Sequence, residues 1–239
     1  MEWGAVVSSI TQVEAARPEE AQGGGRGAGR RAGWGEEEEL GRHVVVRIGD
    51  GRRFTGHCCI GSDGIHSKTR LSILPHTPPL RYLGYIVVLG IFKNSKFPLA
   101  RRRMFQTSDG AARMFVMPFT EHQSMWQLSW KMAEEDALEL AQDRRALRMA
   151  ALQVCTQWHE PIAQIIEKSD FEQHVSGYPA YDRPAATAHE LRPAALSLCS
   201  VLGDAAHPMS PFKGQGANQA LLDGLMLSEA LHRHLSKVS

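Results

Sequence analysis

The sequence predicts a mixed α/β fold in which a domain with an antiparallel sheet is inserted into a second domain of strands and helices. Strand patterns separated by turn residues follow one another between about residues 81 and 130, which is typical of an antiparallel meander. On either side of this region, a predicted strand runs into a turn that contains glycine and aspartate. We therefore expect four parts: a leader at residues 1–42, the first part of the outer domain at 43–79, the inserted domain at 80–180 and the second part of the outer domain at 181–239.

The leader is expected to be of low complexity or disordered. Residues 15–42 are rich in Gly, Arg and Glu, and such a composition buries too little apolar surface to offset the entropy lost on ordering. Order is expected to begin at His43, with a strand over 43–48, a turn at 49–51 and a partner strand over 54–60.

The inserted domain is expected to combine a sheet with helices. Apolar residues at steps of three and four between Leu147 and Ile165 predict helical structure, with Pro161 at a kink or in the first turn of a second helix. Beyond this domain, a loop rich in Gly and Pro at 203–216 separates a strand from a helix over 217–235. The remaining strands are expected at 82–92, 102–106, 113–118, 125–130, 171–178 and 196–202.

Composition excludes several classes of protein. The formal net charge is +1, which gives no global reason to expect a nucleic-acid partner. No apolar run reaches the ~18 residues that a transmembrane segment needs, and the first residues lack the basic start of a signal peptide. The four cysteines show no metal-ligand spacing, so no metal site is expected. We expect reduced cysteines and a cytoplasmic location, with an organelle as the alternative.

The chemistry is expected in the loop after the last predicted strand. Asp204 follows the carboxyl end of that strand, where α/β proteins dock ligands, although an aspartate there can also simply cap a turn. Gly214 and Gly216 allow the backbone to approach a flat ligand closely. The amides at the start of the following helix carry the positive end of its dipole, which suits an anionic group.

Two motifs resemble those of the class A flavoprotein monooxygenases. The segment from Gly203 to Pro208 (Gly-Asp-Ala-Ala-His-Pro), continued by Pro211, Gly214-Gln215-Gly216-Ala217-Asn218 and Asp223, resembles the second FAD-binding motif of that family. The segment from Cys59 to Arg70, with Asp63, Gly64 and Ser67, resembles the family's DG motif, with Ser62 where the family usually has Ala. The resemblance covers about residues 44–235. It implies a partial, Rossmann-like FAD-binding domain with an inserted antiparallel-sheet substrate domain.

The resemblance also implies roles for individual residues. FAD would be the cofactor and NAD(P)H the reductant, and molecular oxygen would hydroxylate or epoxidise a small aromatic or polyene substrate. His207 takes a structural or an acid–base role, and Tyr178 and Tyr181 either line the substrate cavity or pack. For the cofactor, Asp204 would bind the ribose, Pro211 would flank the flavin, Gly214, Gln215, Gly216, Ala217 and Asn218 would hold the isoalloxazine, and Asp63, Gly64 and Arg70 would support the pyrophosphate and NAD(P)H side.

The family opens with a strand, a GxGxxG turn and a helix that hold the FAD pyrophosphate. Only the stretch from Gly23 to Ala28 fits that pattern, and neither an apolar strand nor an apolar helix flanks it. We therefore expect a truncated form without this segment. The alternative function is an inactive flavoprotein remnant that acts as a binding or regulatory module. A halogenase is disfavoured because the segment from Trp126 to Trp130 lacks the WxWxIP pattern, whereas a related reductase stays open; the arginines at 101–103 are interpreted as a solvated strand edge.

Overall fold

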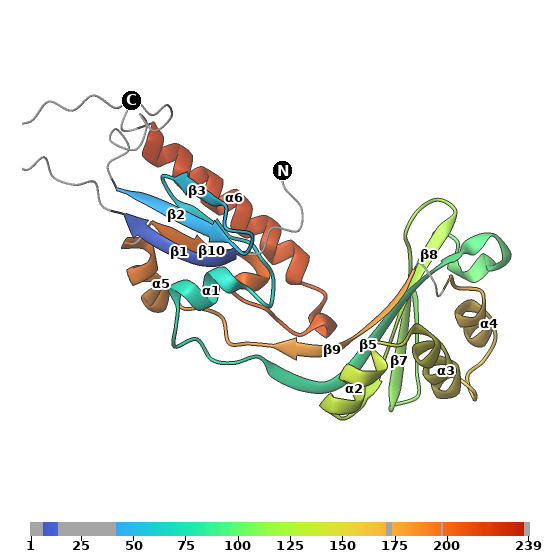
Figure 1. Ribbon diagram of the computed structural model, residues 1–239. Helices are drawn as coiled ribbons and strands as arrows, with labels where there is room; N and C mark the ends of the chain where they lie inside the picture. The colour runs from blue at the N-terminus through green and yellow to red at the C-terminus, as the bar shows by residue number, and fades with distance from the viewer. Residues whose placement is uncertain (1–6, 14–41, 171–173, 197, 237–239) are drawn as a thin grey trace, which may run out of the picture. The chain divides into compact units, whose positions relative to one another are not determined.

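The computed structural model describes residues 7–13, 42–170, 174–196 and 198–236 (Figure 1). The chain divides into two compact units. One consists of Met1–Pro79 together with Arg183–Ser239, and the other is Leu80–Asp182. The second unit therefore has nearly the bounds expected for the inserted domain. Each unit is described by itself below.

A three-stranded antiparallel sheet forms part of the first unit. Its strands, in spatial order, are β1 (Val7–Val13), β2 (His43–Ile48) and β3 (Arg53–Gly56). Order therefore begins within the expected leader, because β1 pairs along β2 and supplies the second neighbour that this central strand needs. The part of the expected leader at residues 14–41 lies outside the described residues.

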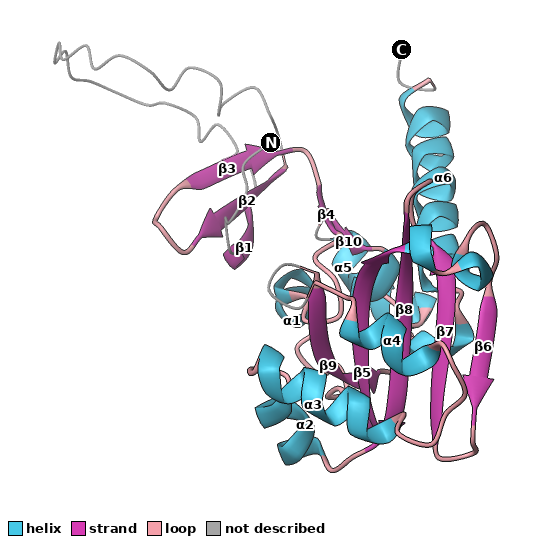
Figure 2. Cartoon of the chain, turned by 90° about the vertical axis from the view of Figure 1, so that its right-hand side faces the viewer, coloured by secondary structure: helices cyan, strands magenta, loops and turns pink. Residues whose placement is uncertain are grey.

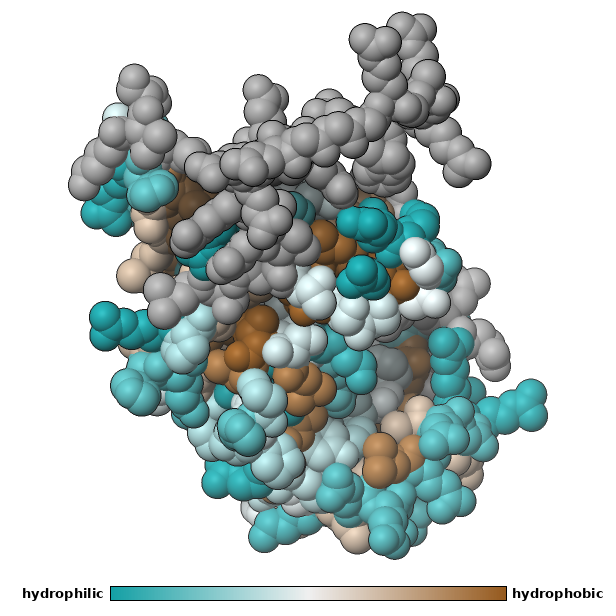
Figure 3. Space-filling view, turned by 60° about the vertical axis from the view of Figure 1, so that its left-hand side comes forward, coloured by the Kyte–Doolittle hydropathy of each residue, from teal (hydrophilic) through white to brown (hydrophobic). Residues whose placement is uncertain are grey.

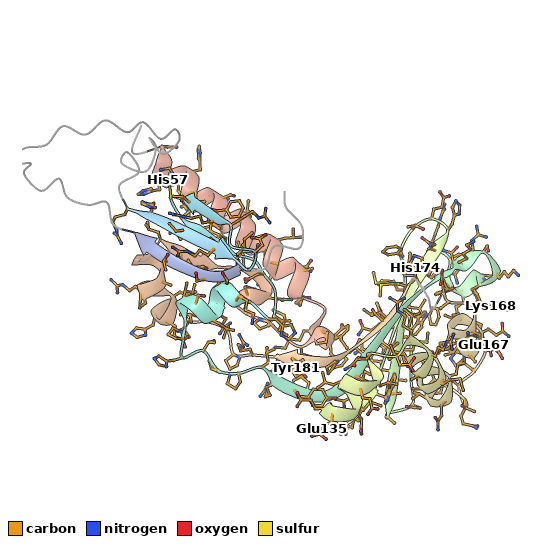
Figure 4. The ribbon with its side chains drawn as sticks, viewed as in Figure 1. His57, Glu135, Glu167, Lys168, His174 and Tyr181 are labelled. Carbon is orange, nitrogen blue, oxygen red and sulfur yellow. The ribbon has the colours of Figure 1, made fainter. Side chains whose placement is uncertain are left out.

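The strand expected over 54–60 is divided between two sheets. β3 ends at Gly56 after pairing with β2, and β4 (Cys59–Gly61) pairs instead with β10 (Cys199–Val201). The chain changes sheets at His57, which is labelled in Figure 4. An alternation of side chains alone cannot reveal this change, because both short strands continue the same extended backbone.

Helices surround the parallel pair of β4 and β10. α1 (Lys68–Ile73) follows β4, and α6 (Gly216–Leu235) closes the described chain. α5 (Ala188–Leu196) was not predicted, and it shortens the strand expected over 196–202 to β10. Thr187 and Glu190 form a capping box at its start: the Thr187 amide donates to Glu190 Oε2 over 2.8 Å, and the Glu190 amide donates to Thr187 Oγ1 over 3.2 Å.

The second unit contains the predicted antiparallel sheet (Figure 2). Its order is β6-β7-β8-β5-β9, and every neighbouring pair is antiparallel. The two edge strands, β6 and β9, begin at Phe105 and Val175, whereas the sequence predicted starts at residues 102 and 171. Residues 171–173 lie outside the described part of the chain. The strands are β5 (Arg81–Lys93), β6 (Phe105–Ser108), β7 (Ala112–Pro118), β8 (Gln123–Lys131) and β9 (Val175–Asp182).

One face of this sheet packs against helices and forms the core of the unit, as Figure 2 shows. Trp126 is fully buried there, and a Cβ atom at the paired Gly90 would lie 2.5 Å from its ring. The glycine therefore makes room for the indole, whose Nε1 donates to Ser169 Oγ over 2.8 Å. The helices are α2 (Glu134–Leu140), α3 (Arg144–Val154) and α4 (Ile162–Glu167), and the short 3₁₀ helices η1 (Asn94–Lys96) and η2 (Pro98–Ala100) follow β5.

The opposite face of the sheet carries half-buried apolar side chains. Side chains of residues that pair across neighbouring strands share a face of the sheet. Gln127 of β8 pairs with Leu89 of β5 and Phe115 of β7, and Met125 of β8 pairs with Ile91 of β5 and Met117 of β7. The apolar residues of this set are neither fully buried nor fully exposed. We call Leu89, Ile91, Phe115, Met117 and Met125 the apolar sheet face.

Apolar side chains also reach the surface of the first unit. Figure 3 shows apolar groups between hydrophilic ones on one side of the molecule. On α6, the exposed large apolar residues are Leu221, Leu222, Leu225, Met226 and Leu231. Despite its apolar character, α6 does not meet the requirements of a membrane span, and neither does any other helix in the described part of the chain.

Candidate functional site

The two motif turns leave the same edge of the parallel strand pair. Val201 at the end of β10 lies in register with Gly61 at the end of β4. The Leu202 amide then donates to the Gly61 carbonyl over 2.9 Å, so the two chains stay together beyond the last strand residues. The carboxyl edge of a parallel pair is where α/β folds place their ligands. Segments that are far apart in the sequence therefore meet at the position expected of a binding site.

In the DG turn, the Asp63 carboxylate is occupied by the start of α1. It accepts hydrogen bonds from the Ser67 hydroxyl and, over 3.0 Å, from the Thr69 amide. Burial would raise the pKa of Asp63, but these hydrogen bonds outweigh it and hold the pKa below its usual value. Ser67 in turn caps the helix by accepting from the Arg70 amide over 2.8 Å. Gly64 follows with φ +76°, a conformation that favours glycine.

Arg70 connects the DG turn to the second motif from inside the protein. Its side chain is buried, at 2% exposure. Nε donates to Thr77 Oγ1 over 2.7 Å, and Nη1 donates to the Ala206 carbonyl over 2.6 Å. The same group also reaches Ala205 at 3.2 Å, and Nη2 donates to Pro184 over 3.1 Å. Most donors of Arg70 are thus used by protein oxygen atoms, and two of its hydrogen bonds hold the loop that carries Asp204.

Asp223 holds the same loop from the side of α6. Its Oδ2 atom accepts from the Gly203 amide over 2.7 Å and lies 2.6 Å from His207 Nε2. Gly203 has φ +59°, and a Cβ atom there would lie 3.2 Å from the Ala220 Cβ. The side chain of His207 is therefore engaged with a carboxylate of the scaffold, in keeping with the structural role considered for it. The sequence signal for Asp223 was only its place in the motif.

Asp204 itself is exposed, in the 3₁₀ helix η3 (Gly203–Ala205). A Cβ atom at Gly216 would lie 3.7 Å from Asp204 Oδ1, so this carboxylate lies beside the first residue of α6. The end of β10 thus presents an exposed acceptor next to the start of a helix. The loop between them is ordered by η4 (Pro211–Lys213) and by Gly214, which has φ +61°.

The N-terminus of α6 has no cap from its own side chains. Gln215 precedes the helix without a side-chain capping bond, and the first turn contains no acidic residue. The first amides of a helix have no partner within it, and they carry the positive end of the dipole. The structure therefore brings most of the predicted site residues together here, all of them exposed or partly exposed: Asp204, Pro211, Gly214, Gln215, Gly216, Ala217 and Asn218.

The two candidate tyrosines belong to the other unit, on β9. The Tyr181 hydroxyl donates to Glu134 Oε1 over 2.7 Å, and its ring packs on Tyr82 with centroids 5.6 Å apart. Burial, together with this hydrogen bond and the charge of Glu134, raises the pKa of Tyr181 to about 12. Tyr181 is therefore held in place by packing and by α2. Tyr178 is 37% exposed.

Comparison with known proteins identifies the family. Residues 35–237 match the family described as FAD binding domain, and the protein therefore belongs to it. The chain is 34% identical over 189 residues to aurachin C monooxygenase/isomerase of Stigmatella aurantiaca, covering 79% of this chain and 46% of that protein. It is 28% identical over 189 residues to 3-amino-4-hydroxybenzoate 2-monooxygenase of Streptomyces cremeus, covering 78% and 44%. The chain spans somewhat less than half the length of these curated relatives.

A solved structure gives the same result for the fold. HpxO of Klebsiella pneumoniae, complexed with FAD and uric acid, matches with a TM-score of 0.61 and 25% identity, covering 74% of this chain and 43% of that chain. The expected family and the expected mixed fold are thus confirmed, and the relatives are FAD-dependent monooxygenases. The groups at the start of α6 also suit FAD: the exposed carboxylate of Asp204 can accept from its hydroxyl groups, and the uncapped amides can donate to an anionic ring edge.

Proposed function

We propose that this chain forms the flavin-ring side of an FAD-dependent, NAD(P)H-using monooxygenase. The enzyme would transfer oxygen from molecular oxygen to a small aromatic or polyene substrate, by hydroxylation or epoxidation. The observation that carries the proposal is the position of Asp204 beside Gly216, at the carboxyl edge of the parallel pair. Family membership and the names of the relatives support the choice of cofactor and reaction class.

The residues of the chain would bind and orient the cofactor. Asp204 would accept hydrogen bonds from a ribose or ribityl hydroxyl, and the first amides of α6, from Gly216 to Asn218, would face the ring edge that becomes negative on reduction. Pro211 would lie along the flank of the ring, where its side chain excludes water. FAD, when bound, supplies the redox chemistry that these side chains lack.

The substrate class is proposed from the second unit. The apolar sheet face offers aromatic, aliphatic and thioether side chains, which suit a flat apolar ring or polyene. Tyr178 lies on β9 opposite Val87, on the same face of the sheet, and its hydroxyl would orient a polar substituent.

Titration with FAD tests the cofactor proposal. The purified chain should perturb the visible spectrum of FAD, and Asp204→Asn should weaken binding about tenfold, because a charged acceptor is lost. Glu229→Gln is the matched control, since it removes an exposed carboxylate from α6 away from the site, and FAD affinity should not change. Absence of FAD binding by the wild-type chain would refute the proposal.

Turnover distinguishes the enzyme from the inactive module. NADH or NADPH should be oxidised faster with FAD and the chain together than with either alone, and an aromatic substrate should be oxygenated. If FAD binds while both pyridine nucleotides remain unoxidised, the chain acts as a flavin-binding module and the monooxygenase proposal fails for it.

A further inference from the structure

We propose that the second unit contains a binding site for a small aromatic carboxylate, at the end of β5 that is remote from Arg81. A cavity of about 420 Å³ lies there, lined on the described chain by residues of β5 and the 3₁₀ turn after it and by Lys168, Asp170 and His174. This volume falls within the range of small-molecule sites, which is roughly 300–1,000 Å³. None of the residues proposed above to hold FAD lines the cavity, and Ile91 is the one residue of the apolar sheet face that does, so FAD binding and binding at this cavity can be tested separately.

The floor of the cavity is apolar. Ile91, Phe92 and Phe97 line it. Phe92 and Phe97 are 2% and 5% exposed, and their rings meet edge to face with centroids 5.4 Å apart. Such a surface favours a flat hydrocarbon group, because aromatic rings gain from both burial and ring–ring contact.

The rim of the cavity is positively charged. Lys93 and Lys96 come from one side of the cavity and Lys168 from the other. Within the described part of the chain, none of these three ammonium groups has a carboxylate at ion-pair distance. Among the described residues of the lining Asp170 is the one acidic residue, and His174 Nδ1 lies 3.5 Å from its Oδ2. Figure 4 labels Lys168 and His174 at the same end of this unit. The described residues of the lining therefore carry an excess of positive charge, which an anionic ligand would neutralise.

Buried hydrogen bonds hold both sides of the cavity. On one side, Asn94 is 2% exposed, and its backbone amide donates to the His122 carbonyl over 3.0 Å. On the other, Ser169 accepts from Trp126 and donates to the Ile165 carbonyl over 2.9 Å. Lys93 and Lys168 each adjoin one of these buried residues in the chain, and Lys96 lies two residues from Asn94. A preformed site loses less entropy on binding than one that must be ordered first.

Charge and shape together define the ligand class. Inorganic phosphate would meet the lysines but leave the aromatic floor without a partner, and a neutral aromatic would do the reverse. A compound with a carboxylate on an aromatic ring satisfies both halves of the cavity. Affinity should fall with rising ionic strength, because the lysine side chains are exposed.

Calorimetric titration of the full chain with 1-naphthoate tests the proposal, with 1-naphthalenemethanol as the neutral analogue of similar shape and inorganic phosphate as the anion without a ring. We expect 1:1 binding of naphthoate, and binding at least tenfold weaker for the other two probes. Lys96→Met and Lys168→Met, one from each side of the cavity, should each weaken naphthoate about fivefold, as the loss of one nearby charge predicts.

Lys131→Met is the matched control, because Lys131 is exposed on β8 and does not line the cavity. Its naphthoate affinity should equal that of the wild type. The proposal is overturned if naphthoate does not bind, if the neutral analogue or phosphate binds as tightly, or if the two cavity variants bind like the control. These lysines are on the surface, so each variant should fold like the wild type. Circular dichroism of each variant checks this and excludes misfolding as the cause of a loss of naphthoate affinity.

Discussion

Nη1 of Arg70 donates a hydrogen bond of 2.6 Å to the carbonyl oxygen of Ala206, across 136 positions of sequence. This bond joins the helix that follows the DG turn to the loop that carries Asp204. The guanidinium is almost completely buried, and its other hydrogen bonds are also to protein oxygen atoms. Arg70 is therefore the interior connection between the two motifs, and the geometry of the candidate cofactor site depends on it.

Replacing Arg70 should destabilise the first unit. Arg70→Ala leaves buried carbonyl groups without donors and removes a large buried side chain, so we expect a loss of about 3 kcal/mol in the free energy of unfolding. Arg70→Lys keeps the charge but has too few directed donors for all four acceptors, and it should recover only part of the loss. Urea unfolding measures both.

Arg192→Ala is the control for this series. Arg192 is exposed on α5, and its removal should change stability by less than about 0.5 kcal/mol. FAD affinity of Arg70→Lys should also fall, since the Asp204 loop loses support. Equal stability of Arg70→Ala and Arg192→Ala would show that the buried hydrogen bonds are not required.

Gly203→Ala tests the close contact between the loop and α6. The substitution imposes a Cβ on a residue with φ +59° and places it 3.2 Å from the Ala220 Cβ. The positive φ costs a non-glycine residue about 1–2 kcal/mol, and the contact adds to it. Combining it with Ala220→Gly removes the contact but not the backbone strain. Thermal melts of the double variant should therefore recover the steric part only, after allowance for the cost of Ala220→Gly alone; full recovery would contradict the assigned strain.

Thiol labelling tests the burial assigned to the cysteines. Cys155 and Cys199 are 1% and 5% exposed, and burial raises the pKa of Cys155 to about 12 and that of Cys199 to about 11. Because the thiolate is the reactive form, both should resist a thiol reagent at pH 8 in the folded chain and react after denaturation. Cys58 is exposed and should react at once. Rapid labelling in a Cys58→Ser variant at Cys155 or Cys199, located by peptide mass, would contradict this assignment.

Sequence patterns predicted the elements that follow a single regular period. The strand at Tyr82–Phe92 and the helix from Ala217 were expected nearly where β5 and α6 lie, because each keeps one periodicity over its length. The division of residues 54–60 between two sheets was missed, since long-range pairing decides it. α5 was missed because Pro193 within it argues against a helix, whereas its capping box favours one.

The motifs predicted which site residues come together, but not what each one does. Asp204 and the start of α6 are close in sequence, so their meeting follows from one turn. The buried role of Arg70 depends on carbonyl groups of residues 184, 205 and 206, and no local pattern shows where those groups point. Backbone acceptors have no sequence signature, so the hydrogen bonds that hold Arg70 inside the protein could not be predicted.

The hydrogen bonds that Asp63 accepts from the start of α1 predict a specific dependence of stability on pH. The folded pKa of Asp63 lies below its usual value of 3.8, because hydrogen bonds from Ser67 and Thr69 outweigh the effect of burial. The charged form therefore contributes stability that is fully present well above pH 3.8 and is lost as the pH falls through the folded pKa. Asp63→Asn should cost about 1 kcal/mol at pH 7, which is typical of a lost capping charge.

The difference between wild type and Asp63→Asn should shrink below about pH 4, because the wild-type carboxyl then takes up a proton and loses the same interaction. Urea unfolding at a series of pH values from 7 to 3 measures it. Asp136→Asn is the control, since Asp136 is exposed on α2 in the other unit. The difference in the free energy of unfolding between wild type and Asp63→Asn would contradict this prediction if it stayed constant down to pH 3. The side chain would then stabilise α1 by its shape, and the negative charge of Asp63 would not contribute to the stability of the DG turn.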